Sequence, residues 1–347
     1  MNRRFQPLLF ALIALLITSC GGGGQSTSEQ ADSKTETSKS GEGEASNASM
    51  AETVADIPYA STRYLIEPSE LKAKMGDPNV KIIDIRKEKG YKLGHIEGAL
   101  SIWRPDVQDL EGYEYGGMRA SKAQMEALLS RLGIKPDDMV VIYDAKGVVD
   151  AARVWWIMNR YGHENAKLLN GGFQGWQEEG MAVTKEETPA PEPTEYKFPA
   201  EENLTLSATK EEVQKAIDDP NVVLLDTRTL DEYTGAFQKP GAAKAGRIPT
   251  AVHIDWANAV HYNGNHRFKD VKSLKEIYEG KGITPDKKVI CYCQSGVRSA
   301  HTTYVLTELL GYDNVKNYDG SWIEWSHDDE LPFETDAEAS AEEKKAS

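Results

Sequence analysis

Short runs of apolar residues recur along this chain, separated by longer segments in which apolar residues return every three or four positions. The runs at 82–83, 139–143, 222–225 and 289–292 are continuous and rich in Val, Ile and Leu. Such runs are typical of strands buried on both faces of a parallel sheet. Their alternation with helical segments predicts an α/β fold with two domains, each a mostly parallel sheet flanked by helices.

Two of the helical segments carry start and stop signals. Ser-x-x-Gln at 121–124 and Ser-x-x-Glu at 273–276 match the capping box, in which two side chains satisfy the first N–H groups of a helix. Gly133 and Gly282 follow the last apolar position of these segments, where glycine commonly ends a helix. A third helix is predicted to run from the end of the last strand to Gly311.

The chain also contains an internal duplication. Segments 77–86, 133–137 and 170–176 match segments 219–228, 282–286 and 319–325, with an offset of 142 residues for the first pair and 149 for the other two. A repeat of this length is a whole domain and not a solenoid unit. We place the domains at 59–186 and 204–335, joined by a proline-rich linker at 187–203.

The first twenty residues have the make-up of an export signal. Two arginines precede an apolar run of ten residues, 8–17, which is too short to span a bilayer as a permanent helix. The run leads to Cys20 through a sequence that resembles the lipobox of bacterial lipoproteins, where the chain is cleaved before a lipidated cysteine. The resemblance implies a signal peptide at 1–19 and a lipid on Cys20; the alternative is a plain signal peptide with a chance cysteine. It also implies a bacterial cell envelope protein, held to the membrane by the lipid alone and facing the periplasm or the exterior.

Composition narrows the function classes. The 347 residues carry a formal net charge of −15, which argues against a nucleic-acid partner because such partners need a cationic surface. Segments 20–56 and 327–347 carry net charges of −5 and −6, so most of the net charge lies near the two ends. We predict that 20–58 is a disordered tether and that 336–347 is a disordered tail. Three cysteines in a chain of this length exclude a disulfide-stapled fold.

The segment 289–300 is the strongest candidate for chemistry. It runs from a buried strand through Cys293 and a tight loop into a helix, and parallel sheets place their ligands at this end of a strand. The N–H groups of the loop and of the helix start favour an anion, so we expect the pKa of the Cys293 thiol to be lowered. Arg298 lies in the first helical turn, where a cation is unfavourable unless an anion faces it. Cys291 is expected to be a buried bystander.

Together these features resemble the rhodanese family, the two-domain thiosulfate sulfurtransferases. The resemblance covers about residues 60–335 and is carried by Cys293 to Ser299, the two Asp-x-Arg sequences, Gly-His-Ile-Glu-Gly-Ala at 94–99 and the segment 318–325. It implies two tandem rhodanese-like domains, in which Cys293 takes a sulfane sulfur from thiosulfate as a persulfide. The sulfur then passes to cyanide or to a thiol, including that of a small redox protein. No cofactor or metal is expected.

The resemblance also implies roles for the residues around Cys293. Those expected to bind the donor or the transferred sulfur are Arg298, Gln294, Ser295, Gly296, Val297 and Ser299. Those expected to support the loop from behind are Asp226, Arg228 and Trp322. Glu232 departs from the pattern, because vertebrate members have an arginine there.

The first half lacks this chemistry. The offset of 149 residues places Asp144 on Cys293 and Val149 on Arg298. The first domain is therefore predicted to be catalytically silent. We hypothesise that the Asp144 carboxylate occupies the anion site of its own loop as a built-in ligand.

Three other functions fit parts of the pattern. A 3-mercaptopyruvate sulfurtransferase uses the same chemistry, but members of that kind favour an uncharged loop with threonine at the position of Arg298. A membrane-tethered sulfur carrier or sensor would form the same persulfide with little turnover. A phosphatase is disfavoured, because related phosphatases of this fold have five residues between the cysteine and the arginine, whereas four separate Cys293 from Arg298.

Overall fold

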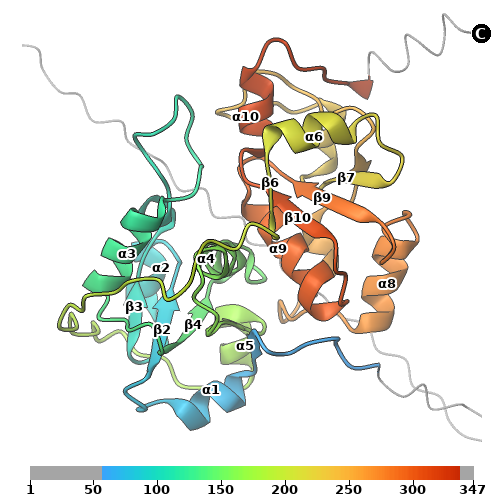
Figure 1. The fold of residues 1–347 in the computed structure, drawn as a ribbon. Helices are drawn as coiled ribbons and strands as arrows, with labels where there is room; N and C mark the ends of the chain where they lie inside the picture. The colour runs from blue at the N-terminus through green and yellow to red at the C-terminus, as the bar shows by residue number, and fades with distance from the viewer. Residues whose placement is uncertain (1–56, 337–347) are drawn as a thin grey trace, which may run out of the picture. The chain divides into compact units, whose positions relative to one another are not determined.

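The computed structural model describes residues 57–336 (Figure 1). The predicted signal peptide, Cys20, nearly all of the predicted tether and most of the predicted tail lie outside the described residues. Among the residues that are described, no helix is long and apolar enough to cross a membrane.

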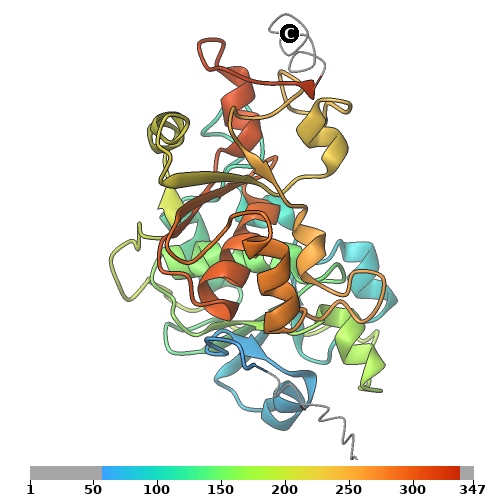
Figure 2. The same cartoon turned by 90° about the vertical axis from the view of Figure 1, so that its right-hand side faces the viewer.

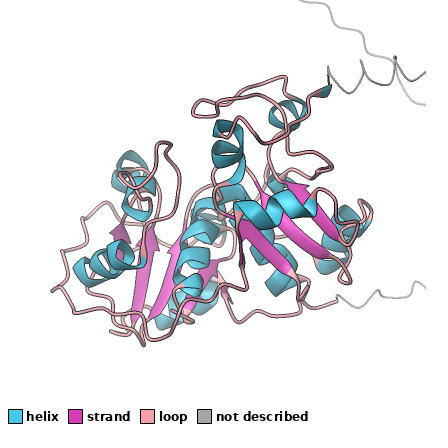
Figure 3. Ribbon diagram, turned by 45° about the horizontal axis from the view of Figure 1, so that its top comes forward, coloured by secondary structure: helices cyan, strands magenta, loops and turns pink. Residues whose placement is uncertain are grey.

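The first half is built on a five-stranded, fully parallel sheet in the order β1-β5-β4-β2-β3. Its strands are β1 (Leu65–Ile66), β2 (Val80–Asp84), β3 (Ala99–Ser101), β4 (Met139–Tyr143) and β5 (Ala166–Leu169). Its helices are α1 (Pro68–Lys74), α2 (Glu88–Leu93), the 3-10 helix η1 (Arg104–Val107), α3 (Lys122–Arg131), α4 (Val149–Arg160) and α5 (Gly172–Glu178). The helices flank the sheet on both sides (Figure 3).

The second half, which faces the viewer in Figure 2, repeats this design. Its parallel sheet has the strand order β6-β10-β9-β7-β8. Its strands are β6 (Ser207–Ala208), β7 (Val222–Asp226), β8 (Val252–His253), β9 (Lys288–Tyr292) and β10 (Val315–Tyr318). Its helices are α6 (Lys210–Ala216), α7 (Leu230–Thr234), the 3-10 helix η2 (Trp256–Ala259), α8 (Val271–Glu279), α9 (Val297–Tyr304), the π-helical turn η3 (Val305–Leu309) and α10 (Ser321–His327). The prediction of two α/β domains with flanked parallel sheets is confirmed.

The central strands are the apolar runs seen in the sequence. β4 is buried from Val140 to its end, and β9 is buried from Val289 to its end, because helices cover both faces of each sheet. Asp226 at the end of β7 pairs with Tyr292 at the end of β9. The parallel register therefore brings the loop after β9 next to the loop after β7, and this edge of the sheet carries the candidate site.

One of the two predicted helix starts is wrong. Ser121 caps α3 as expected, with a complete capping box. For α8 the cap is Asp270, whose carboxylate accepts the N–H of Ser273 at 2.9 Å. Aspartate is an equally good cap, so the helix starts before the predicted serine. It also ends at Glu279, ahead of the glycine at 282 that was predicted to end it.

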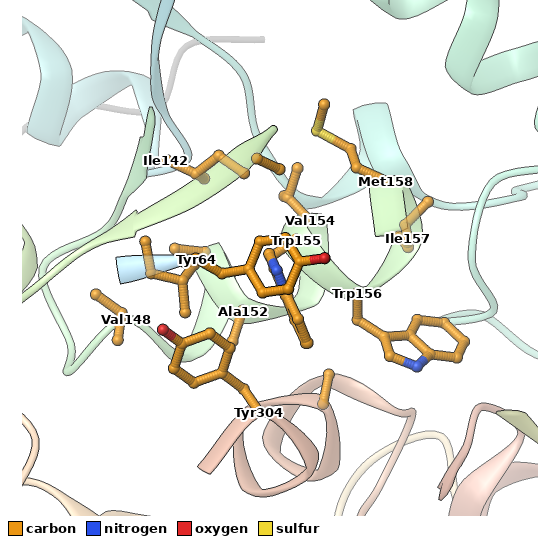
Figure 4. Packing of buried hydrophobic residues seen from close by; sticks show 14 of the residues in the cluster. Tyr64, Ile142, Val148, Ala152, Val154, Trp155, Trp156, Ile157, Met158 and Tyr304 are labelled. Atoms are coloured by element: carbon orange, nitrogen blue, oxygen red, sulfur yellow. The ribbon is translucent and has the colours of Figure 1, made fainter. Parts of the chain in front are cut away.

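The two halves share one apolar core. Helices α4 and α9 pack against each other, and the largest buried cluster contains residues from both (Figure 4). The Trp155 ring of α4 meets the Tyr304 ring of α9 edge to face, with centroids 4.9 Å apart, and meets Tyr64 at 5.6 Å. Edge-to-face pairs add to the free energy gained by burial. The described residues, 57–336, accordingly belong to one compact unit.

The predicted linker is anchored to the folded body by two buried aromatic residues. Residues 187–203 contain no helix or strand, yet Tyr196 and Phe198 are buried in the core. The Tyr196 hydroxyl is hydrogen-bonded to Nδ1 of His163 at 2.9 Å. The segment is thus part of the folded body.

Candidate active site

Cys293 follows the last residue of β9 and opens the loop that leads into α9. The side chain is 1% exposed, and Cys293 and Cys291 are both free thiols. Gly296 ends the loop with φ +71°, and a Cβ there would lie 2.6 Å from an Arg153 nitrogen and 2.8 Å from an Asp319 oxygen. This turn needs glycine for its backbone conformation and for its lack of a side chain.

Three carbonyl groups of the loop are held from outside. Their donors are the N–H groups of Trp322 and Ile323, at 3.0 and 2.9 Å from the carbonyls of Cys293 and Gln294, and the side-chain amide of Asn317, at 3.2 Å from that of Gly296. The C=O and N–H of a trans peptide point in opposite directions. In each case the N–H of the following residue therefore points toward the inside of the loop, where a negative sulfur would lie.

Ser321 holds the same loop from the turn after β10. Its Oγ accepts the N–H groups of Cys293 at 3.1 Å and Gly296 at 3.0 Å, and its hydroxyl donates to the carbonyl of Tyr318 at 2.7 Å. Its φ is +51°, a left-handed conformation that costs a non-glycine residue about 1–2 kcal/mol. Our sequence reasoning missed this residue. The repeat carries the signal, because Ser321 aligns with Gly172, whose φ is +56°.

The surroundings of Cys293 favour its thiolate. Burial raises the pKa of the thiol, but the Arg298 guanidinium, the hydroxyl and N–H of Ser299 and the N–H of Ser295 together lower the pKa to about 7. A thiol with this pKa is roughly half ionised at neutral pH. Burial raises the pKa of Cys291 to about 12, so this neighbour stays protonated.

Arg298 is paired with a buried carboxylate. Its two terminal nitrogens donate to the two oxygens of Glu232 at 2.6 and 2.8 Å. Burial raises the pKa of Glu232, but Arg298 outweighs burial and holds the pKa at about 2. Lys239 lies near the same carboxylate, with its Nζ 4.0 Å from a Glu232 oxygen. Glu232 thus takes part of the positive charge that we expected to meet the donor. Lys239 belongs to no motif and could not be found from the sequence.

The predicted supporting residues lie together. Arg228 makes an ion pair with Asp226, with Nη2 2.6 Å from Oδ2, and donates to the carbonyl of Gly246 at 2.8 Å. Its guanidinium also lies 4.9 Å from the centre of the Trp322 ring. Because this charge is compensated locally, the pair can fix geometry without adding charge to the loop. Gln294, predicted to bind the donor, is 6% exposed, and its side-chain amide has no hydrogen-bond partner among the described residues.

The two halves have the same strand order and an equivalent loop after the central strand, and both halves resemble one known family. A family model described as "Rhodanese-like domain" matches residues 67–179 and 209–328, one match in each half. The chain belongs to the rhodanese family. The duplication read from the sequence is therefore a pair of rhodanese-like domains.

Relatives of this rhodanese have names connected with sulfur. A protein of Saccharopolyspora erythraea, provisionally named a thiosulfate sulfurtransferase, is 38% identical over 258 residues, which are 72% of this chain and 88% of that protein. The sulfur carrier protein TtuD of Thermus thermophilus is 36% identical over 280 residues, or 78% and 95% of the two chains. The anaerobic ergothioneine biosynthesis enzyme of Chlorobium limicola, solved as a crystal structure, shares the fold with a TM-score of 0.70. The two sequences are 24% identical, and the match covers 80% of this chain and 71% of the ergothioneine enzyme.

The first rhodanese-like domain holds a carboxylate where the second holds the thiol. Oδ1 of Asp144 accepts the N–H groups of Lys146 and Val148 at 2.7 and 3.0 Å, and Oδ2 accepts those of Asp150 and Ala151 at 2.7 and 3.2 Å. Burial and the nearby Asp150 carboxylate raise the pKa of Asp144 to about 6, so it is largely ionised at neutral pH. A built-in ligand requires this geometry, in which each oxygen takes two loop N–H groups. Its contribution to stability stays a prediction.

The Cys293 thiol is thus surrounded by N–H groups of its loop and by the side chain of Arg298, with Lys239 near Glu232. Within residues 57–336, no group of three or more His, Cys, Asp or Glu side chains could hold a metal ion. His253, one of three histidines between 253 and 266, is hydrogen-bonded through Nε2 to the carbonyl of Arg228 at 2.8 Å.

Proposed function

We propose that this rhodanese moves a sulfane sulfur from thiosulfate to cyanide or a thiol through a persulfide on Cys293. The proposal rests on the state of that thiol, which lies at a strand end, has a pKa of about 7 and receives inward N–H groups. Relatives provisionally named thiosulfate sulfurtransferases add support.

The reaction proceeds in two displacements. The Cys293 thiolate attacks the outer sulfur of thiosulfate, a new S–S bond forms, and sulfite leaves with the electron pair of the old S–S bond. The persulfide anion then lies among the N–H groups of the loop, which stabilise its charge without having to reorient. A cyanide ion or a thiolate attacks the terminal sulfur and takes it, and the Cys293 thiolate is restored.

Two cations are available for the anionic donor. Arg298 retains N–H groups that Glu232 does not use, because a guanidinium has five. Lys239 is 43% exposed at its side chain, whereas the side chains of Arg298 and Glu232 are 12% and 4% exposed. Thiosulfate carries two negative charges and mercaptopyruvate one, so this charge favours thiosulfate.

A sulfur carrier is the second candidate. The observation that favours it is the relative named as a sulfur carrier protein, which matches over most of both chains. A carrier would load one sulfur on Cys293 and pass it only to a partner protein. Steady production of thiocyanate from thiosulfate and cyanide supports the enzyme, whereas a single stoichiometric burst supports the carrier.

The deciding experiment is the intact mass of the protein after exposure to thiosulfate or, separately, to 3-mercaptopyruvate. We expect a gain of about 32 Da, one sulfur, from thiosulfate, lost on adding cyanide and absent in Cys293→Ser. A gain only with mercaptopyruvate would reassign the donor. No gain with either donor would remove the proposal.

We further propose that Cys20 is lipidated and tethers the protein to a bacterial cell membrane. The support is the sequence alone, in which a short apolar run ends at this cysteine. Detergent phase separation of cell extracts should place the wild type in the detergent phase and Cys20→Ser in the aqueous phase. An aqueous wild type would refute the anchor.

A further inference from the structure

Arg153 is a residue of the silent domain that touches the cysteine loop of the other domain. It lies on α4 and is 3% exposed. One terminal nitrogen, Nη1, donates to the carbonyl of Gly296 at 3.3 Å and pairs with Oδ1 of Asp319 at 2.5 Å. The other, Nη2, donates to the carbonyl of Gly117 at 3.2 Å. A single buried side chain thus joins three backbone segments around the loop.

The bond to Gly296 bears on the direction of one peptide. The Gly296 carbonyl accepts from Arg153 at 3.3 Å and from the Asn317 amide at 3.2 Å. Both bonds hold the carbonyl outward and so turn the N–H of Val297 toward the inside of the loop, because the two groups of a trans peptide are opposed. Along the loop this N–H lies between those of Ser295 and Ser299, which both lower the pKa of Cys293. The planar guanidinium suits the task, since it donates in several fixed directions at once.

The pairing with Asp319 bears on charge. Asp319 is 6% exposed and lies against the loop, with Oδ1 2.8 Å from where a Cβ on Gly296 would be. An unpaired carboxylate there would oppose a thiolate on Cys293. Arg153 compensates this charge, and Arg119 adds a second ion pair at 2.9 Å on the other oxygen.

The silent loop has no matching arginine, and its aligned residue Asn170 is joined to the other half by a neutral bond, in which Oδ1 accepts the N–H of Phe268 at 3.2 Å. The offset of 149 residues that aligns Asp144 with Cys293 aligns Asn170 with Asp319 and places Thr302 at the position of Arg153. Both replacements are neutral, and Asn170 donates its amide to Glu67 at 2.8 Å. The buried charged link accompanies the loop that carries the thiol.

We propose that Arg153 is a positioning residue for sulfur transfer: from the silent domain it fixes the Gly296–Val297 peptide and compensates Asp319, so that the Cys293 loop is held ready for a negative sulfur. The proposal rests on the proposed function for its catalytic consequence. Its claim about the loop stands apart from the identity of the donor.

The test compares Arg153→Met and Arg153→Lys with Arg119→Met in the full-length protein. Arg119 is the matched control, because it pairs with Asp319 and makes no bond to the loop carbonyls. The first measurement is the alkylation rate of Cys293 by iodoacetamide against pH, followed by tandem mass spectrometry of the peptide that also holds Cys291. The second is kcat/KM for thiosulfate, and circular dichroism reports whether each variant is folded.

In Arg153→Met we expect the apparent pKa of Cys293 to rise by about one unit, with a roughly fivefold lower alkylation rate at pH 7 and a fall in kcat/KM at least as large. Arg153→Lys restores charge at Asp319 without the planar geometry and should lie between this variant and the wild type. Arg119→Met should stay within about twofold of the wild type in both readouts.

A folded Arg153→Met with an unchanged alkylation profile would overturn the proposal. An equal shift in Arg119→Met would also overturn it, because the charge on Asp319 and not the loop bond would then be the cause. If Arg153→Met does not fold, the lysine variant decides by the same criteria. A wild type without sulfur transfer would remove the proposed function and leave the alkylation result valid.

Discussion

At the scale of single residues, the candidate site is governed by which way backbone N–H groups point. Cys293 supplies the thiol, while Ser321 holds two neighbouring N–H groups from a left-handed backbone conformation. Glu232 lowers the reactivity of the Cys293 thiol, because its carboxylate offsets part of the positive charge of Arg298. The reactivity of the thiol is therefore set by several residues that need not touch the donor.

Two substitutions of Ser321 distinguish the effect of its hydroxyl hydrogen bonds from the cost of its positive φ. Ser321→Ala removes the hydroxyl and keeps the strained backbone, whereas Ser321→Gly removes both. We expect both to raise the pKa of Cys293 and to lower kcat/KM on the order of tenfold. In urea titrations, the free energy of unfolding should be about 1 kcal/mol larger for the glycine variant than for the alanine variant. Equal stabilities would show that the positive φ carries no cost.

Glu232→Gln should make Cys293 more acidic. With the carboxylate gone, the full charge of Arg298 acts on the thiolate, so the midpoint of the alkylation profile is expected below the wild-type value of about 7. The KM for thiosulfate should fall as well, because N–H groups of Arg298 become free. A higher midpoint would contradict this account of the pair.

The same residue predicts a pH dependence of stability. The folded pKa of Glu232 is depressed from 4.5 to about 2, so its ion pair stabilises the fold fully above pH 4.5 and is lost as the pH falls through 2. The difference in unfolding free energy between wild type and Glu232→Gln should therefore shrink between these two pH values. Urea titrations across this range measure it, and a constant difference would refute the assignment.

At the scale of elements, local patterns predicted what is local. The apolar runs identified β4 and β9, and the serine cap identified α3, because each signal lies within a few neighbouring residues. The strands β1 and β6 have two residues each and offer no pattern to detect. The role of Arg153 depends on a loop more than a hundred residues away, and no local pattern carries that information.

The silent loop offers a test at this scale. Asp144→Ala leaves four N–H groups of the loop without their acceptor, and each unsatisfied buried group costs about 1–3 kcal/mol where water cannot replace it. We expect a loss of unfolding free energy of about 2–4 kcal/mol, measured by urea denaturation, after partial entry of water. Asp144→Asn keeps one acceptor and should lose less. Unchanged stability in the alanine variant would refute the built-in ligand.

At the scale of the whole molecule, the two rhodanese-like domains are held by a common interior. Trp155 of α4 and Tyr304 of α9 are fully buried against each other, and the cluster around them includes residues of both sheets. Neither domain can keep this surface from water alone. The first domain thus supports the structure of the domain that carries Cys293.

Trp155→Ala tests this coupling. Removing a buried tryptophan costs about 3–5 kcal/mol. If the halves unfold together, calorimetry should show one transition in the wild type and one transition, at lower temperature, in the variant. Two transitions of which only the first moves would mean that the domains unfold independently.

The asymmetry between the two loops has an evolutionary consequence. The substitution Asp144→Cys would give the first domain a thiol but not its partners. The position of Arg298 would still hold Val149, and the position of Ser321 would still hold Gly172. At least three coordinated changes separate the first copy from a reactive one, and the first of them removes a carboxylate that accepts four N–H groups of its own loop. If Asp144 stabilises its loop as we predict, the first of these changes costs stability before any reactivity is gained, so the difference between the two copies is hard to remove one residue at a time.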